Sequence, residues 1–166
     1  MIARTICISM LLLLLTSCAS QSTPQDPTPI PEDIEIFLER GPCFGACPVY
    51  SVTIQSDGTV LYQGVRFVEQ DVEVQSSISQ ADLNRLVDAF EEAKFFDFED
   101  AYNDSVEGIC KEFLTDASFV TISITIDGTS KQVNHYTGCR GFRDEAELIA
   151  LEDLIDEVVN TGQWIK

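Results

Sequence analysis

Positively charged residues are scarce in this sequence. Only 10 Lys and Arg stand against 28 Asp and Glu among the 166 residues, so the formal net charge is −18. A surface with this excess of acid repels the phosphates of nucleic acids and anionic lipid head groups, which excludes both as favoured ligands. It can attract cationic partners or divalent ions, but the acids are scattered and lack the D-x-D-x-D-G spacing of a calcium loop. The pattern predicts an acidic, solvated surface.

The short patterns of common catalytic sites are also missing. The chain has one histidine, His135, and no G-x-S-x-G around a serine nucleophile. The glycine-bearing segments 41–45 and 138–142 have neither the lysine nor the strand-to-helix setting of a phosphate loop. We therefore predict that the protein is not an enzyme and holds no cofactor. A hydrolase built on paired carboxylates stays a third alternative, because 28 acids offer many pairs.

The N-terminus carries a short apolar run that ends at a cysteine. Residues 6–15, ICISMLLLLL, follow the single basic residue Arg4, and the run is too short to span a membrane comfortably. The next residues complete the tetrapeptide LTSC at 15–18, which resembles the lipobox of bacterial lipoproteins. The resemblance implies removal of residues 1–17 and attachment of diacylglycerol and an acyl chain, such as palmitate, to Cys18. An ordinary secretory signal with a chance cysteine is the alternative.

The lipobox resemblance also implies a location. Several acyl chains anchor a protein stably, so the domain is expected to be attached to a membrane of the bacterial cell envelope. Ala19 follows the lipidated cysteine, and in Gram-negative lipoproteins the lack of aspartate there favours the outer membrane. Residues 18–32 are rich in Pro, Ser, Thr and Gln and predict a disordered tether. The mature chain loses Arg4 alone among its charges, so its net charge is 9 − 28 = −19.

Residues 33–166 have the alternating patterns of a sheet and two helices. Strands are expected within 33–41, 49–64, 67–74 and 118–138, with hairpin turns at Asp57-Gly58 and Asp127-Gly128. Residues 67–74 are expected to place Val72 and Val74 in phase. The order strand, hairpin, strand, helix, hairpin, helix predicts a single α+β domain. It would be an antiparallel sheet of about five to six strands with two helices packed on one face.

The two helices are marked by apolar stripes at three-four spacing. In the first, Ser79 is the expected N-cap and the end lies near Lys94, with Leu83, Leu86, Val87 and Phe90 inward. In the second, Gly162 is expected to end the helix and the inward residues are Leu148, Leu151, Ile155 and Val158.

Of the six cysteines, Cys7 leaves with the signal and Cys18 carries the lipid, which leaves Cys43, Cys47, Cys110 and Cys139. Export places these four in an oxidising compartment, where an even count predicts two disulfides. The second hairpin brings residues 110 and 139 together, and a turn through Gly45 can bring residues 43 and 47 within the roughly 4.4–6.8 Å that a disulfide needs. We therefore favour the two local pairs. The alternative joins the first turn to the second hairpin.

A different role for the first cysteine pair is copper or thiol handling. Cys43-x-x-x-Cys47-Pro48 with a later histidine, His135, resembles the copper site of Sco-type cytochrome oxidase assembly proteins, and two thiolates with an imidazole suit copper. That family has a thioredoxin-like fold with a helix after the motif, whereas VYSVTI at 49–54 predicts a strand. A metal site at Cys43, Cys47 and His135 is therefore kept as the alternative and not favoured.

A wider resemblance covers the whole region from 33 to 166. Cys43, Gly45, Cys47, Pro48 and Tyr50 match the Cys-x-Gly-x-Cys-Pro-x-Tyr signature of an uncharacterised bacterial family, a domain of unknown function in lipoproteins and secreted proteins. This resemblance implies an extracytoplasmic setting and brings no activity. We expect a lipid-anchored envelope domain with a binding or structural role, attached to the membrane through Cys18 and with an envelope protein as a candidate partner.

Overall fold

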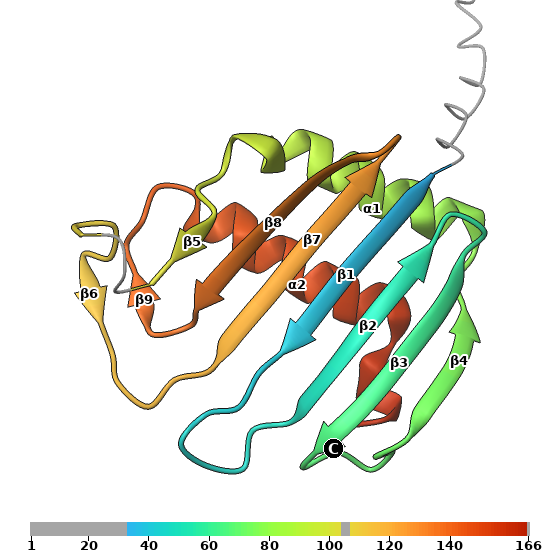
Figure 1. The fold of residues 1–166 in the computed structure, drawn as a ribbon, viewed down its shortest axis with the longest axis horizontal. Helices are drawn as coiled ribbons and strands as arrows, with labels where there is room; N and C mark the ends of the chain where they lie inside the picture. Colours follow the sequence, from blue (N-terminus) through green and yellow to red (C-terminus); the bar gives the residue numbers. More distant parts are fainter. Residues whose placement is uncertain (1–32, 104–106, 166) are drawn as a thin grey trace, which may run out of the picture.

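Seven strands form one sheet, in the order β4-β3-β2-β1-β7-β8-β5 (Figure 1). The computed structural model describes residues 33–103 and 107–165; the predicted signal peptide (1–17), the tether (18–32) with the lipidation site Cys18, and residue 166 lie outside these. The strands are β1 (Ile34–Arg40), β2 (Val49–Gln55), β3 (Thr59–Arg66), β4 (Glu73–Ser77), β5 (Ala101–Tyr102), β7 (Phe119–Ile126) and β8 (Thr129–Tyr136). A separate two-stranded ribbon joins β6 (Glu112–Phe113) to β9 (Cys139–Arg140).

The sheet has seven strands and not the expected five to six. Six of the seven pair antiparallel, as predicted, but β5 lies parallel to β8, with Ala101 opposite Asn134 and Tyr102 opposite His135. A two-residue strand has no periodicity of its own, so only the pairing partner identifies it. Both Asp-Gly turns are present. Asp127 and Gly128 have φ angles of 49° and 77°, both positive, as a tight two-residue hairpin turn requires.

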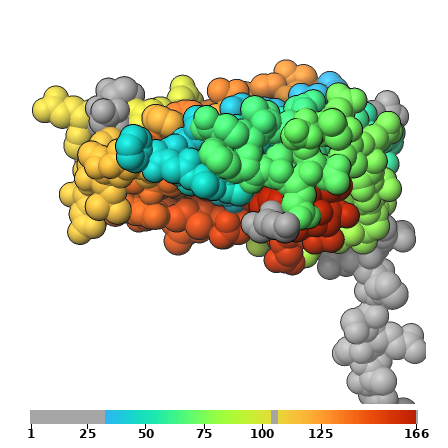
Figure 2. Space-filling view, turned by 90° about the horizontal axis from the view of Figure 1, so that it is seen from below, coloured from blue at the N-terminus to red at the C-terminus, as the bar shows by residue number. Residues whose placement is uncertain are grey.

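Two helices cover one face of the sheet, as expected. α1 (Gln80–Glu92) and α2 (Glu145–Val159) lie behind the strands in Figure 1, and Figure 2 shows α2 in red beneath the layer of strands. Ser79 is the N-cap of α1, and its hydroxyl accepts a hydrogen bond from the backbone N–H of Asp82. The four predicted inward residues of α1 are all buried. None of the helices in 33–103 and 107–165 is long and apolar enough to cross a membrane.

Three local expectations were wrong. β4 begins at Glu73, so Val72 lies before the strand and is 53% exposed. On α2 the last inward residue is Val159 instead of Val158. Val159 follows the buried Ile155 by four residues, close to the helix period of 3.6, so both side chains lie on the same face. The end of α2 is set by Asn160, whose φ of 58° is left-handed, and not by Gly162; Asn tolerates this conformation better than most residues.

The core lies between the sheet and the helices. Ile36, Val52, Ile122 and Val133 project from four neighbouring strands and are completely buried. Trp164 closes one side of this core, with its ring centroid 4.5 Å from that of Tyr62. The opposite face of the sheet alternates with the core face and carries half-buried and exposed residues.

Candidate functional site: the disulfide-linked end of the sheet

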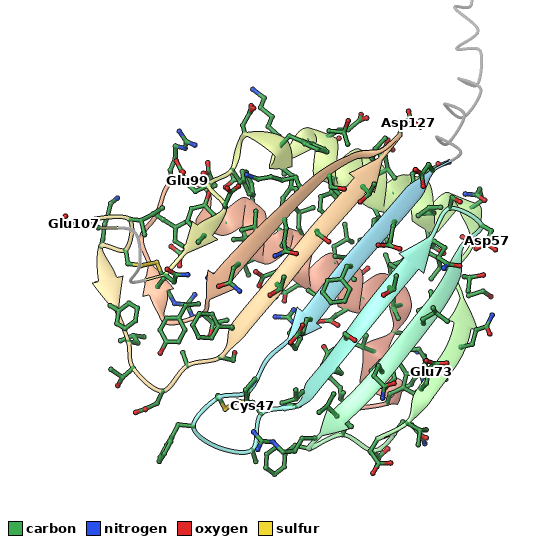
Figure 3. All side chains as sticks on the ribbon, viewed as in Figure 1. Cys47, Asp57, Glu73, Glu99, Glu107 and Asp127 are labelled. Atoms are coloured by element: carbon green, nitrogen blue, oxygen red, sulfur yellow. A yellow bond between two sulfur atoms is a disulfide. The ribbon has the colours of Figure 1, made fainter. Side chains whose placement is uncertain are left out.

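Both predicted cysteine pairs are disulfides in the structure. Cys43 and Cys47 close the loop between β1 and β2, with their Cα atoms 5.8 Å apart. Cys110 and Cys139 are bonded with their Cα atoms 5.0 Å apart and tie the segment before β6 to β9. Figure 3 places Cys47 at the end of the sheet opposite the turns labelled Asp57 and Asp127. The two bonds therefore hold loop segments at the end where β1 finishes and β7 begins.

His135 lies away from the first cysteine pair, inside the core. Its side chain is 1% exposed, and Nδ1 lies 2.8 Å from Oε1 of Glu152 on α2. An ionised carboxylate accepts hydrogen bonds, so Nδ1 is the donor when Glu152 is charged, and Nε2 has no partner among the described residues. Nowhere in 33–103 and 107–165 do three or more His, Cys, Asp or Glu side chains gather as a metal-holding group. The structure does not bring His135 together with Cys43 and Cys47.

A polar network joins the last residue of β1 to α2, just below the first disulfide loop. Nη2 and Nε of Arg40 lie 2.8 and 3.0 Å from Oδ2 of Asp156, and Nη2 also lies 3.2 Å from Asp153. The hydroxyls of Tyr50 and Thr161 donate to Oδ1 of Asp156 at 2.7 and 2.8 Å. Asp156 therefore accepts from three side chains that come from β1, β2 and the segment after α2.

Glu152 links this network to the buried histidine. Its Oε2 lies 3.7 Å from Nη1 of Arg40, while its Oε1 holds His135. Glu152 is 2% exposed, and a buried carboxylate is tolerated when it is paired in this way. The network therefore neutralises two inward acids of α2 against the end of β1.

The network shifts the pKa values of its members. Burial and the neighbouring charge of Asp156 raise the pKa of Tyr50, so that this phenol stays protonated well above its usual range. Burial by itself would lower the pKa of Arg40, but the charges of Asp156, Tyr50 and Glu152 outweigh it and raise that pKa. Arg40 is therefore a permanent cation at the base of the disulfide loop.

Sequence reasoning missed this network, although a signal was present. Glu152 and Asp156 follow Leu148 at intervals of four residues along α2, and Val159 follows three residues later. Two acids therefore lie on the inward edge of an apolar stripe. An acid in that position needs a cation, and Arg40 is a base at the end of an otherwise alternating strand. The sequence pattern of α2 thus indicates that these acids face inward, whereas the order of the strands in the sheet decides which cation lies beside them.

Backbone contacts fix the disulfide loop against the segment that leads into β7. The N–H of Gly41 donates to the carbonyl of Phe119 at 2.8 Å, and the N–H of Phe44 donates to the carbonyl of Asp116 at 3.3 Å. The Cys43–Cys47 bond closes the turn between these contacts and β2. Phe44, at the tip, is 87% exposed. The loop therefore presents an aromatic ring to solvent and does not bury it.

Large exposed hydrophobic side chains concentrate at this end of the sheet. Eight such residues are found in the described part of the chain, and seven of them lie on or beside the loops at the end where β1 and β3 finish and β7 begins. We call these seven the apolar end: Phe44, Val65, Phe67, Val72, Phe113, Leu114 and Phe119. Figure 2 looks onto this end and shows the cyan β1–β2 loop beside the gold segment at 112–118. The eighth residue, Phe96, lies in the short helix after α1.

Side chains in the apolar end are held in place by the fold. Tyr136 is almost buried, and its ring lies 4.9 Å from the rings of both Phe113 and Phe119. Its hydroxyl accepts a hydrogen bond from the N–H of Ala117 at 3.0 Å. Gly138 allows the closest approach, because a Cβ there would lie 2.1 Å from the carbonyl oxygen of Leu114. These contacts keep the 113–119 segment against the sheet with its apolar side chains outward.

Two residues of this end adopt a backbone conformation that is unfavourable for non-glycine residues. Phe67 has a φ of 56°, which costs roughly 1–2 kcal/mol, and Asp116 has a φ of 67°, which aspartate tolerates better. The guanidinium of Arg66 lies 5.0 Å from the ring centroid of Phe67 and stabilises the ring from one side. The exposed side chains of the apolar end can contact another apolar surface.

A protein family described as "Domain of unknown function (DUF6438)" matches residues 34–159, from the first residue of β1 to the last residue of α2. No curated protein matches the sequence significantly.

Proposed function

Because this chain belongs to the DUF6438 family, a domain family of unknown function, we propose that it is a lipid-anchored cell-envelope domain that binds an envelope protein through the apolar end. The role is binding and not catalysis. The observation that carries the proposal is that seven of the eight large exposed hydrophobic residues found in the described part of the chain lie at one end of the sheet, where two disulfides hold neighbouring segments.

The position of the anchor supports this role. The proposed lipid is attached to Cys18 and the tether enters the domain at Asp33, whose carbonyl accepts from the N–H of Asp127 in the β7–β8 turn. β1 then runs seven residues, about 23 Å, to Arg40 beside the apolar end. An apolar surface at the far end of β1 is directed away from the point of attachment, where a partner protein can reach it.

The chemistry of the surface also favours a protein partner. Aromatic side chains are enriched at the centres of protein interfaces, and four of the seven residues of the apolar end are phenylalanines. Rings held by the fold lose little conformational entropy on binding, which raises affinity for a given buried area. The net charge of the mature chain, −19, disfavours adsorption to anionic lipid instead.

Copper or thiol handling by Cys43, Cys47 and His135 is the alternative, and the geometry gives it less support. The two cysteines are bonded to each other and the imidazole is buried against Glu152. A reduced, copper-binding form that loses its metal on His135→Ala would favour this alternative and overturn the binding role as the main function.

Site-specific crosslinking tests the proposal. A photoreactive amino acid is placed at Phe44 in the full chain, expressed in its own bacterium, and a matched chain carries it at Phe96, which is exposed to 44% but lies outside the apolar end. We expect one discrete crosslinked envelope protein from position 44 and none from position 96. Equal crosslinking from both positions, or none from position 44, would contradict the proposal.

A further inference from the structure

A shallow groove runs between α1 and α2 on the side of the molecule that faces away from the sheet. Two adjoining hollows of ≈ 260 and ≈ 540 Å³ share Ala89 and Glu92 of α1 and Leu154 of α2. The floor of the smaller hollow is apolar and consists of small and aliphatic side chains: Ala89, Ala93, Ala150, Leu151 and Leu154. We call this feature the interhelical groove. It lies on the helix layer and is separate from the apolar end.

The rims of the interhelical groove are acidic and their charges are not neutralised. Asp88 and Glu92 come from α1 and Glu147 comes from α2, and all three are exposed. Their side chains form no hydrogen bond or ion pair with another residue in 33–103 and 107–165. The one basic residue at the groove, Arg85, is already paired, because Nη2 lies 2.9 Å from Oε1 of Glu157. Like charges therefore face each other across an apolar floor.

We propose that the interhelical groove binds a segment of a protein partner in which Lys or Arg residues flank one or two aliphatic side chains. A volume of ≈ 260 Å³ suits side chains of that size, and their burial against leucine and alanine supplies the apolar contribution. Cations on both sides of the inserted side chain pair with the two rims and remove their mutual repulsion. The net charge of −18 steers such a segment towards the molecule.

The small floor residues decide the shape of the occupant. Alanine at 89, 93 and 150 leaves room for the partner's side chain to approach the helix backbones, as in helix-in-groove recognition. A basic amphipathic helix, with leucine on one face and lysine beside it, satisfies both the floor and the rims. This inference does not depend on the apolar end, and either surface can be disproved without the other.

Binding of a fluorescein-labelled helical peptide of leucine and lysine to the full chain tests this inference. The neutralised pair Glu92→Gln/Glu147→Gln is compared with Glu35→Gln/Glu39→Gln on β1, which changes the net charge equally at exposed positions away from the groove. Each partly exposed ion pair contributes a small part of the affinity, so we expect the groove pair to weaken binding about fivefold or more and the β1 pair to change it less than twofold. Ala150→Trp, which fills the floor without altering charge, should also weaken binding about fivefold.

Three outcomes would overturn this inference. The first is an equal loss of affinity in both charge-matched pairs, which would mean diffuse attraction to an acidic protein. The second is unchanged affinity in Ala150→Trp, which would mean that nothing enters the groove. The third is equal binding of a matched peptide with glutamate in place of lysine. Circular dichroism of each variant establishes that the fold is retained.

Discussion

Replacing Asp156 by alanine should destabilise the domain by about 3 kcal/mol, although the residue lies near the surface. Its side chain is 19% exposed, but it accepts hydrogen bonds from Tyr50, Thr161 and Arg40. Tyr50 is 3% exposed and Thr161 is 2% exposed. Removing the carboxylate leaves two buried hydroxyls without an acceptor, and a buried polar group without its partner costs roughly 1–3 kcal/mol.

The contribution of Arg40 to this loss is smaller than that of the hydroxyls. In the variant its guanidinium keeps Asp153 at 3.2 Å and Glu152 at 3.7 Å, so its charge is still compensated. Losses at groups that share one partner do not add fully, so the total falls near 3 kcal/mol, less than the sum of the single terms. For a folded domain of this size that corresponds to a decrease in Tm of about 10 °C.

Urea unfolding with both disulfides intact measures this loss, and two other variants separate its causes. Asp153→Ala removes a carboxylate that also contacts Arg40 but is 70% exposed, so we expect less than about 1 kcal/mol. Asp156→Asn keeps an oxygen that accepts from Tyr50 and Thr161 while losing the charge, and should fall between the two alanine variants. If Asp156→Ala were no more destabilising than Asp153→Ala, the buried hydroxyls would not depend on this carboxylate and the reasoning would be refuted.

Three further predictions concern titration, close packing and the anchor. Burial raises the pKa values of Tyr50, Tyr62 and Tyr102 above the value of about 10 that they have in the unfolded chain. Their contribution to stability is therefore fully present below pH 10 and is lost as the pH rises above it. Tyrosinate absorbance and unfolding should change together as the pH is raised, and separate transitions would contradict this prediction. Gly138→Ala should displace the carbonyl of Leu114 and lower the Tm by several degrees, an effect that Gly162→Ala, where nothing lies within 4 Å, should not have. Cys18→Ser should abolish labelling with radioactive palmitate and leave the precursor uncleaved by the lipoprotein peptidase, and normal processing would disprove the lipobox assignment.

Local patterns were enough to predict most elements of this fold. The alternation in β1, the Asp-Gly turns of both hairpins and the inward residues of α1 all depend on spacing between neighbours in the chain. The pairing of Cys110 with Cys139 was predicted for the same reason, because the second hairpin brings its own ends together. The local closure of Cys43 with Cys47 needed only a turn that Gly45 allows.

The features that failed, or could not be predicted, depend on contacts between distant segments. β5 is recognisable only because Ala101 and Tyr102 lie along β8. The acids on the inward edge of α2 could be seen in the sequence. Their partner could not, because Arg40 lies 112 residues before Glu152 and 116 before Asp156 and contacts them only because β1 is the central strand of the sheet.

The sequence by itself determined most of the elements and the acidic character of this protein and favoured the two disulfide pairs, since each follows from composition or from residues close together in the chain. Only the tertiary structure decided which side chains face outward together. Phe44 and Phe67 lie in two loops and Phe119 begins β7. These residues are far apart in sequence, and they share one end of the sheet because the antiparallel pairing of the strands places the ends of β1 and β3 at the same end as the start of β7. A surface of this kind is a property of strand order, which short-range patterns do not contain.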